Sequence, residues 1–255
     1  MASFSTPAIM LRRIDYGEYD LIITFFTLNM GKISTIAKYA KKSVKRFSGI
    51  LELFSVLQVV CSPGRGKGLP VLQEASLQRP FPKIRADIKK TAYASYWAEL
   101  INEWLEDGKK QIRLYHLFQY VLNELDLDQT PESAVSILFQ MRFMSISGFC
   151  PNLRHCCICG IETKKMKTDK IFFNIKKGGL VCENCVPGSS GNIYLSKGTI
   201  KQLLWVGNGD LARAKRLRFS HNALNESTKF LEAFVPYHLG RETKSLKILK
   251  QLRQE

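Results

Sequence analysis

The residues with the clearest chemistry are five cysteines that stand in two short groups. The first group reads CCICG over residues 156–160, and the second reads VCENC over residues 181–185. Each group contains a Cys-x-x-Cys pair, and 22 residues (160–181) separate the two pairs. This spacing is typical of a zinc ribbon, in which two tight turns joined by a short hairpin each present two thiolates. The predicted zinc ligands are Cys156, Cys159, Cys182 and Cys185.

Four thiolates complete the tetrahedral coordination of Zn²⁺ and leave no position for water or substrate, so we predict a structural zinc ion. Gly160 follows the second ligand and suits a turn that needs positive φ. Cys157 lies between the ligands of the first pair, where i, i+2 ligation would strain the turn, so we interpret it as the spare thiol. Two alternatives stay open: His155 could replace one ligand, or the four thiols could carry no metal.

A second stretch with a definite chemistry is KYAKKSVKRF, residues 38–47, in which cations alternate with aromatic rings. Cations contact phosphates and rings stack on bases, which is the chemistry of a groove for single-stranded nucleic acid. A solvated basic loop is the alternative, but the stretch falls in a long connection, which favours binding. The predicted contacts here are Lys38, Tyr39, Lys41, Lys42, Lys45, Arg46 and Phe47.

The stretch SPGRGKGLP, residues 62–70, is also basic and contains three glycines. It lacks the GK[ST] ending of a phosphate-binding P-loop, so we interpret it as a flexible finger between two strands. By contrast, IDYGEYD, residues 14–20, is acidic and would repel phosphate, so we expect binding to lie toward the other loops. Further predicted contacts are Arg65 and Lys67 in the finger, and Arg213, Lys215, Arg216 and Arg218 near the C-terminus.

No catalytic set is recognisable, because HExxH, GxSxG and Walker A sequences are all missing. The four histidines are scattered along the chain and are interpreted as structural or surface groups. Asp15, Glu18 and Asp20 could serve as magnesium ligands of a nuclease, but they fall on a predicted hairpin turn, where a solvated acidic loop is favoured. We therefore expect no enzymatic activity.

The elements that must position the basic loops are five short segments rich in β-branched and aromatic residues. Asn29-Met30-Gly31 predicts a tight hairpin between the second and third segments, and residues 40–50 form a longer polar connection before the fourth. This spacing favours an OB-fold barrel over an SH3-like barrel. The predicted strands are residues 8–14, 21–27, 33–39, 51–60 and 70–77.

From Ile84 onward the apolar residues follow a helical period. A stripe from Ile84 to Trp104 and a second amphipathic segment from Ile112 to Leu125 predict two helices. Thr130 and Pro131 are predicted to be the N-cap and first position of a helix that stops at Gly148. Further helices are predicted at residues 196–206 and 220–239, each opened by a serine, and the last stretch is basic and amphipathic.

These elements predict a multidomain α+β protein, with an OB-fold barrel followed by an all-helical domain that a four-cysteine zinc-ribbon module interrupts. The predicted divisions are residues 1–80 for the nucleic-acid-binding barrel, 81–149 for the first helical part, 150–190 for the zinc module and 191–255 for the second helical part.

The net charge of +16 is unevenly distributed. It is +6 over residues 1–80, −1 over 81–150, +5 over 151–200 and +6 over 201–255. Segregated positive charge indicates surfaces that face a polyanion, with nucleic acid favoured over membrane. No leader or membrane segment is evident, and the unpaired Cys61 and Cys150 suit a reducing compartment, so we expect a soluble, cytoplasmic protein.

Several stretches together resemble the bacterial RecO family of recombination mediators. They are IMLRRIDYGEYDLIITFFT, the following Gly31-Lys32, GFCPNLRHCCICG, VCENC and YHLGRETKSLKIL, which extend over nearly the whole chain. The most specific marks are Tyr16-Gly17-Glu18 with Asp20, the four spaced cysteines, and His238-Leu239-Gly240 with Ser245-Leu246-Lys247. Cys157 departs from the plain Cys-x-x-Cys pattern.

The resemblance implies a non-enzymatic protein associated with the nucleoid. It implies binding to single- and double-stranded DNA, annealing of complementary strands, contact with the acidic tail of the single-stranded-DNA-binding protein, and work with RecR to load RecA. Some relatives lack the cysteines, so zinc would stabilise the fold rather than act directly. The alternatives are a zinc-ribbon OB protein that acts on RNA, as a ribosome or transcription accessory factor, and a metal-dependent nuclease.

Overall fold

The computed structural model describes residues 3–43, 45–64, 66, 68–186, 193–208, 211 and 218–254. The chain divides into two compact units. The first comprises Met1–Leu127 with Thr243–Glu255, and the second comprises Asp128–Glu242. Within the described ranges, no helix is both long enough and apolar enough to span a membrane.

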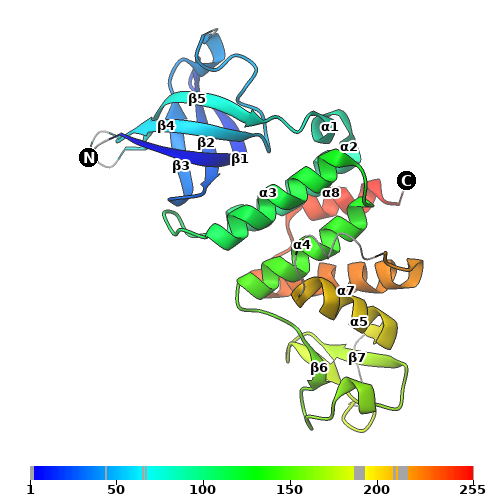
Figure 1. The fold of residues 1–255 in the computed structure, drawn as a ribbon. Coiled ribbons are helices and arrows are strands. Elements are labelled where there is room, and N and C mark those ends of the chain that lie inside the picture. Colours follow the sequence, from blue (N-terminus) through cyan, green and yellow to red (C-terminus); the bar gives the residue numbers. More distant parts are fainter. Residues whose placement is uncertain are drawn as a thin grey trace. The chain divides into compact units, whose positions relative to one another are not determined.

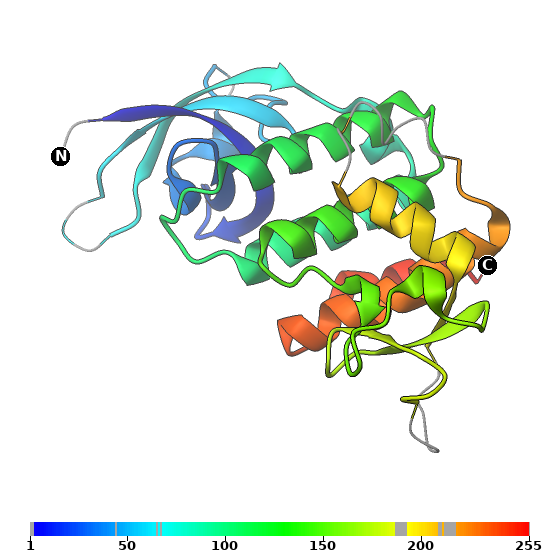
Figure 2. The same cartoon turned by 60° about the horizontal axis from the view of Figure 1, so that its bottom comes forward.

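The first unit begins with a closed five-stranded barrel in the order β1-β2-β3-β5-β4 (Figure 1). β1 pairs with β4 through its first half and with β2 through most of its length. Its register shifts between Met10 and Arg12, and such a bulge lets a strand bend, as the dark blue strand of Figure 2 does. The expected OB-like barrel is confirmed. The strands are β1 (Phe4–Tyr16), β2 (Asp20–Thr27), β3 (Gly31–Ala37), β4 (Val56–Ser62) and β5 (Val71–Arg79).

The strand boundaries differ from those expected by up to five residues, and at two of them a residue with positive φ is the reason. The fourth strand begins at Val56 rather than at residue 51, because Phe54 has φ of 69° and interrupts the extended chain. The third strand ends at Ala37, because Tyr39 has φ of 54° and leads into a 3₁₀ turn, η1 (Ala40–Lys42). The hairpin between β2 and β3 is confirmed, and its turn ends at Gly31 with φ of 69°.

The barrel core is filled from the strands and from one connection. Buried side chains such as Ile23, Phe25 and Val59 point inward from alternating strand positions. Phe47 and Leu51, from the connection between β3 and β4, belong to the same apolar cluster. The long connection is therefore anchored in the core rather than freely solvated.

The helices of the first unit are α1 (Pro82–Ala86), α2 (Ile88–Trp104), α3 (Ile112–Leu127) and α8 (Lys244–Leu252). The single stripe expected from Ile84 to Trp104 is broken at Asp87, whose carboxylate caps α2 by accepting from the N–H groups of Lys89 (2.8 Å) and Lys90 (3.0 Å). α8 lies beside α2 (Figure 1).

Two contacts attach the barrel to these helices within the first unit. The ring of Phe26 on β2 packs edge-on against Tyr115 of α3, with ring centres 5.6 Å apart. The ammonium group of Lys32 on β3 donates to the carbonyl of Asn102 (2.7 Å) and lies 3.3 Å from the Asp107 carboxylate. The barrel and the helical residues of this unit therefore share one packed structure.

In its described residues, the second unit contains three long helices and a small sheet. The helices are α4 (Glu132–Ile146), α5 (Lys197–Asn208) and α7 (His221–Leu239). The sheet has the order β6-β8-β7-β9, with β6 (Asn152–Cys156), β8 (Gly179–Val181), β7 (Lys170–Asn174) and β9 (Tyr194–Ser196), and a 3₁₀ turn, η2 (Thr163–Lys165), follows β6. The hairpin expected between the cysteine pairs is present as β7 and β8.

The expected helix starts are partly correct. The side chain of Ser220 caps α7 by accepting from Ala223 N–H (3.3 Å), and Ser196 likewise accepts from Thr199 N–H (3.3 Å) at the start of α5. The expected cap at Thr130 is wrong, because Pro131 has an extended ψ of 134° and is itself the N-cap residue. Its carbonyl accepts from Ala134 N–H (2.9 Å).

Gly31 offers a test of the contact between the barrel and the segment before α3. A Cβ at this position would lie 2.1 Å from the carbonyl oxygen of Lys109, and φ of 69° is strained for alanine. We expect Gly31→Ala to lower the free energy of unfolding of the first unit by about 3 kcal/mol, measured by urea denaturation.

Gly49→Ala is the matched control, because Gly49 has φ of 68° but nothing within 4 Å of the added Cβ. It should cost only the backbone strain, about 1 kcal/mol. Equal losses in the two variants would show that the close approach to Lys109 is not important.

Candidate metal centre and nucleic-acid interface

The second unit brings four thiols together. Their Sγ atoms lie within 4.8 Å of one another, and those of Cys159 and Cys182 are 3.6 Å apart. Zn–S bonds of about 2.3 Å in a tetrahedron place sulfur atoms about 3.8 Å apart, so this spacing fits one metal ion. In the part of the chain that the structure describes, this is the one group of candidate metal ligands: Cys156, Cys159, Cys182 and Cys185.

Two backbone turns hold the thiols. After β6, Gly160 has φ of 76°, as expected, and donates its N–H to the carbonyl of Cys156 (3.0 Å). After β8, the carbonyl of Cys182 accepts from Cys185 N–H (2.9 Å). The Cys156 sulfur itself accepts from Ile158 N–H (3.5 Å) and Cys182 N–H (3.4 Å). Donors pointed at sulfur stabilise a thiolate, which is the form that binds metal.

The pKa values of the four thiols differ within the cluster. Burial acts to raise the pKa of Cys156, but backbone N–H groups that point at its sulfur lower it to about 6. The hydrogen bond with Cys182 contributes most to raising the pKa of Cys185 to about 12. Each added thiolate repels those already present, so four thiolates coexist here only with a cation between them. The cluster could therefore hold a metal ion and has the donor set that Zn²⁺ prefers.

The two neighbours of the first ligand lie outside the cluster. The backbone N–H of Cys157 donates to the carbonyl of Leu180 (2.8 Å), and its half-buried side chain lies against Gly179 of β8. His155 is exposed and forms a β-bridge with Glu162. Neither is among the grouped ligand atoms.

The barrel carries a hollow of about 630 Å³ on its outer surface. One side comes from Lys38 and Arg46 of the β3–β4 connection, and the other from the β4–β5 connection, including Leu69. Tyr16, 53% exposed at the end of β1, also lines it. The hollow therefore combines cations with an exposed ring, the two features by which a groove binds single-stranded nucleic acid, and it also has aliphatic surface.

The basic connection has a defined shape near its start. Tyr39, whose side chain is 62% exposed, is held in its left-handed conformation by Asp20, whose carboxylate accepts its N–H at 2.7 Å. The Tyr39 ring stacks on Tyr19, with centroids 6.1 Å apart, and the ammonium group of Lys42 lies 3.6 Å from the centre of the Tyr19 ring. A ring pair with a cation over it is a surface on which bases stack.

The acidic turn between β1 and β2 lies against the basic connection. The Asp15 carboxylate is 3.0 Å from the Lys41 ammonium group, which also donates to the Gly17 carbonyl (3.4 Å). The acidic turn and the basic connection are thus in direct contact. The turn neutralises Lys41, and through Asp20 it positions Tyr39. Among the described residues, Lys38, Lys45 and Arg46 make no ion pair.

One expected contact is wrong. Phe47 is 3% exposed within the barrel core, so its ring is not available for stacking on a base. In the sequence, Phe47 and Tyr39 are both aromatic residues of one basic stretch, so a buried ring could not be distinguished from an exposed one. Of the other predicted contacts, Arg218 is exposed, whereas the following lie outside the described residues: Arg65, Lys67, Arg213, Lys215 and Arg216.

Tyr16, Tyr19 and Leu69 are surface residues of this region that were not among the predicted contacts. Tyr16 and Tyr19 belong to the sequence IDYGEYD. Its two tyrosines could have indicated stacking rings, but its three carboxylates led to the prediction that the stretch repels phosphate. Asp15 and Asp20 are occupied by Lys41 and by the Tyr39 N–H, and these carboxylates are not grouped as metal ligands in the described ranges.

Comparison with known proteins gives consistent matches over both halves of the chain. Residues 1–81 match the family described as "Recombination protein O N terminal", and residues 85–247 match "Recombination protein O C terminal". Similar proteins called "DNA repair protein RecO" occur in Desulfosudis oleivorans (43% identity, 99% of each chain covered) and Desulfatibacillum aliphaticivorans (43% identity, 100% of this chain and 99% of the relative).

A more distant relative with the same name, from Syntrophus aciditrophicus, is 32% identical over 99% of this chain and 97% of its own. The similarity to these relatives therefore extends over the whole chain and is not confined to one module. Because both family matches and full-length relatives agree, the chain belongs to the RecO family of DNA repair proteins.

Proposed function

We propose that this protein is a recombination mediator that binds single- and double-stranded DNA and anneals complementary strands without catalysing a chemical reaction. In this role it helps to load RecA, together with RecR, onto strands coated by single-stranded-DNA-binding protein, whose acidic tail it contacts. Such work is done at the nucleoid, in the cytoplasm. Membership of a DNA repair family supports DNA as the ligand rather than RNA.

The observation that carries the proposal is the barrel hollow lined by Lys38, Arg46 and Tyr16. Its cations are free of ion pairs within the described residues, so they are available to phosphates. The nearby stack of Tyr39 on Tyr19 offers a ring to bases without selecting a sequence. We propose that single strands enter here, with Lys41, Lys42 and Lys45 adding charge along the same connection.

Annealing follows from this arrangement without an energy source. Two complementary strands repel each other through their phosphates, and a basic surface lowers that repulsion while it keeps both strands close. The sequence contains no P-loop through which ATP would act. The protein's contribution is electrostatic, and it weakens as salt screens the charges.

We propose that the thiol cluster binds one Zn²⁺ ion whose role is structural. Four thiolates would close the coordination sphere, so no water would be activated there. The ion would fix the turns after β6 and β8, and with them the ribbon sheet. Cys157 would take no part in ligation.

Annealing of coated strands is the experiment that tests the proposed function. Complementary oligonucleotides coated with single-stranded-DNA-binding protein should anneal faster with this protein, in the absence of ATP, and the acceleration should disappear at high salt. Fluorescence energy transfer between labelled strands measures the rate. No acceleration, or a preference for RNA of the same sequence, would contradict the proposal; so would Mg²⁺-dependent cleavage that a Glu18→Ala variant loses.

The barrel groove is tested by the salt dependence of single-strand binding. Replacing three unpaired cations should remove three phosphate contacts and flatten the plot of log K against log[salt] by about 2, at about 0.7 per contact. The variant carries Lys38→Ala, Lys45→Ala and Arg46→Ala. Fluorescence anisotropy of a labelled oligonucleotide measures the slope.

The matched control removes three exposed lysines of the same unit that lie outside the hollow: Lys83, Lys89 and Lys110. Its slope should stay close to that of the wild type. If both triple variants lower the slope equally, then DNA recognises overall charge and not this groove.

The metal centre is tested by comparing two neighbouring cysteines. Cys159→Ser should lose the metal and unfold the ribbon, because structural zinc contributes roughly 10–16 kcal/mol in zinc-finger peptides. Cys157→Ser, the control, should retain one zinc per chain and the wild-type melting temperature. Atomic absorption and thermal melting provide the measurements. Loss of zinc from Cys157→Ser, with retention in Cys156→Ser, would overturn the ligand assignment.

A further inference from the structure

A carboxylate lies beside the cations of the candidate groove. Asp20 is the first residue of β2, and it is half-buried against the basic connection between β3 and β4. A negative charge in this place repels phosphates, so charge alone predicts tighter binding of single strands when the carboxylate is removed. The hydrogen bond that Asp20 makes leads to the opposite expectation.

The backbone of Tyr39 depends on that hydrogen bond. Tyr39 has φ of 54°, in the left-handed region, where the Cβ of any residue other than glycine is crowded by its own backbone. The Asp20 carboxylate accepts the Tyr39 N–H at 2.7 Å, and a hydrogen bond to a charged acceptor is stronger than one between neutral groups. The carboxylate therefore stabilises a conformation that the tyrosine on its own would avoid.

The position of the Tyr39 ring follows from this backbone conformation. The ring stacks on Tyr19, with centroids 6.1 Å apart and planes inclined by 13°, and Tyr39 is still 62% exposed. The ammonium group of Lys42 lies 3.6 Å from the centre of the Tyr19 ring. In an ordinary conformation with negative φ, the Cβ of Tyr39 would point elsewhere and its ring would leave this stack. Asp20 thus determines where a ring is offered to a base.

Asp15, in the same acidic turn, has a different kind of partner. Its carboxylate lies 3.0 Å from the ammonium group of Lys41, so its partner is a side-chain cation, whereas Asp20 binds a backbone N–H. Removal of Asp15 frees a cation for a phosphate, and removal of Asp20 releases a ring. The two carboxylates therefore allow contacts with phosphates and contacts with bases to be changed separately.

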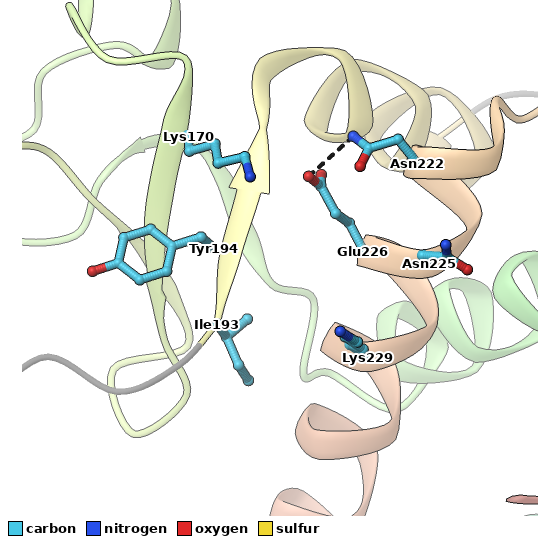
Figure 3. A pocket seen from close by; sticks show the side chains of 7 residues that line it. All are labelled: Lys170, Ile193, Tyr194, Asn222, Asn225, Glu226 and Lys229. Atoms are coloured by element: carbon cyan, nitrogen blue, oxygen red, sulfur yellow. Dashed lines mark hydrogen bonds between the residues drawn. The ribbon is translucent and has the colours of Figure 1, made fainter.

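Glu226 provides a carboxylate of the second unit for comparison. It lies on α7 and lines a hollow of about 330 Å³ together with Lys170 and Lys229 (Figure 3). Its carboxylate accepts from the side-chain amide of Asn222 at 3.1 Å, as the dashed line in the figure shows. Because Glu226 belongs to the other compact unit, Glu226→Gln raises the net charge by one without changing the candidate groove.

We propose that Asp20 is a positioning residue for the stacking of a base on Tyr39. Its carboxylate acts through the Tyr39 backbone and holds the ring where a base of a single strand stacks, while cations of the same connection bind phosphates. The proposal deepens the proposed function and rests on it for the presence of DNA in this groove. It gives a residue of the acidic turn, which charge alone would exclude, an effect on the binding of bases.

The test compares two labelled oligonucleotides of equal length, one with normal bases and one with abasic sites in their place. Anisotropy with the full-length, zinc-loaded protein measures both affinities. Their ratio reports stacking, and the slope of log K against log[salt] reports phosphate contacts. Asp20→Ala should lower the ratio by about fivefold or more, the effect of one lost stacked base. Asp20→Asn keeps an oxygen that accepts the Tyr39 N–H, so it should retain the wild-type ratio and share the slope of Asp20→Ala.

Four further variants serve as controls. Asp15→Asn should keep the wild-type ratio but steepen the slope by about 0.7, because Lys41 gains a phosphate. Glu226→Gln should change neither quantity. Asp20→Val, whose side chain favours a strand, is a second variant without the acceptor and should behave like Asp20→Ala. Tyr39→Leu should lower the ratio as much as Asp20→Ala does, and the two changes together should lower it no further, because both act through one ring.

A wild-type ratio in Asp20→Ala and Asp20→Val would overturn the proposal, as would an equal loss in Asp20→Asn. Additive losses in Asp20→Ala/Tyr39→Leu would overturn it too. So would tighter binding of Asp20→Ala to both oligonucleotides by one factor, since the carboxylate would then act only by repelling phosphates. A wild type that bound neither oligonucleotide would contradict the proposed function as well, whereas the other outcomes contradict this inference alone, so the two failures are distinguishable.

Discussion

Closure of the barrel depends on the pairing of β1 with two partners at once. Its first half is hydrogen-bonded to β4 and its second half to β2, with a register shift between Met10 and Arg12 where the strand bends. A straight strand would leave one edge of the sheet unpaired, and unpaired edges associate with other chains. Closure also brings the end of β1 and the connections after β3 and β4 to the hollow on its surface. The candidate groove therefore depends on the pairing of β1 with both β2 and β4.

The second unit depends on the clustering of four cysteine thiols. Four sulfur atoms lie within 4.8 Å of one another, an arrangement that four thiolates on their own would resist. The turns after β6 and β8 direct backbone donors toward these sulfurs. The ribbon sheet packs in turn on α7 through Phe173, Phe230 and Phe234, whose ring centres are 4.6–5.6 Å apart. A metal ion between the thiols would therefore also stabilise the packing of this sheet on α7.

Ion pairs within the protein, as well as its net charge, determine which cations are available to a polyanion. The chain has a net charge of +16, yet Lys41 and Lys32 are each occupied by a carboxylate of the protein. The acidic turn next to the groove has two effects, since Asp15 neutralises one cation while Asp20 fixes the backbone of the exposed ring Tyr39. Exposed ion pairs contribute little to stability, so their main consequence here is to decide which cations remain free for a polyanion.

The sequence determined those features that local patterns specify. Alternating strands, the Asn29-Met30-Gly31 turn and two Cys-x-x-Cys pairs led to the barrel, the hairpin and the thiol cluster, because turn conformation and ligand spacing depend on neighbouring residues. Tertiary structure alone decided which residues of a mixed stretch face the solvent. Phe47 and Tyr39 both looked like stacking rings, but Phe47 is buried in the apolar cluster of the barrel core, whereas Tyr39 is exposed. The proximity of Asp15 to Lys41 likewise arises from residues far apart in the chain, and no local pattern encodes it.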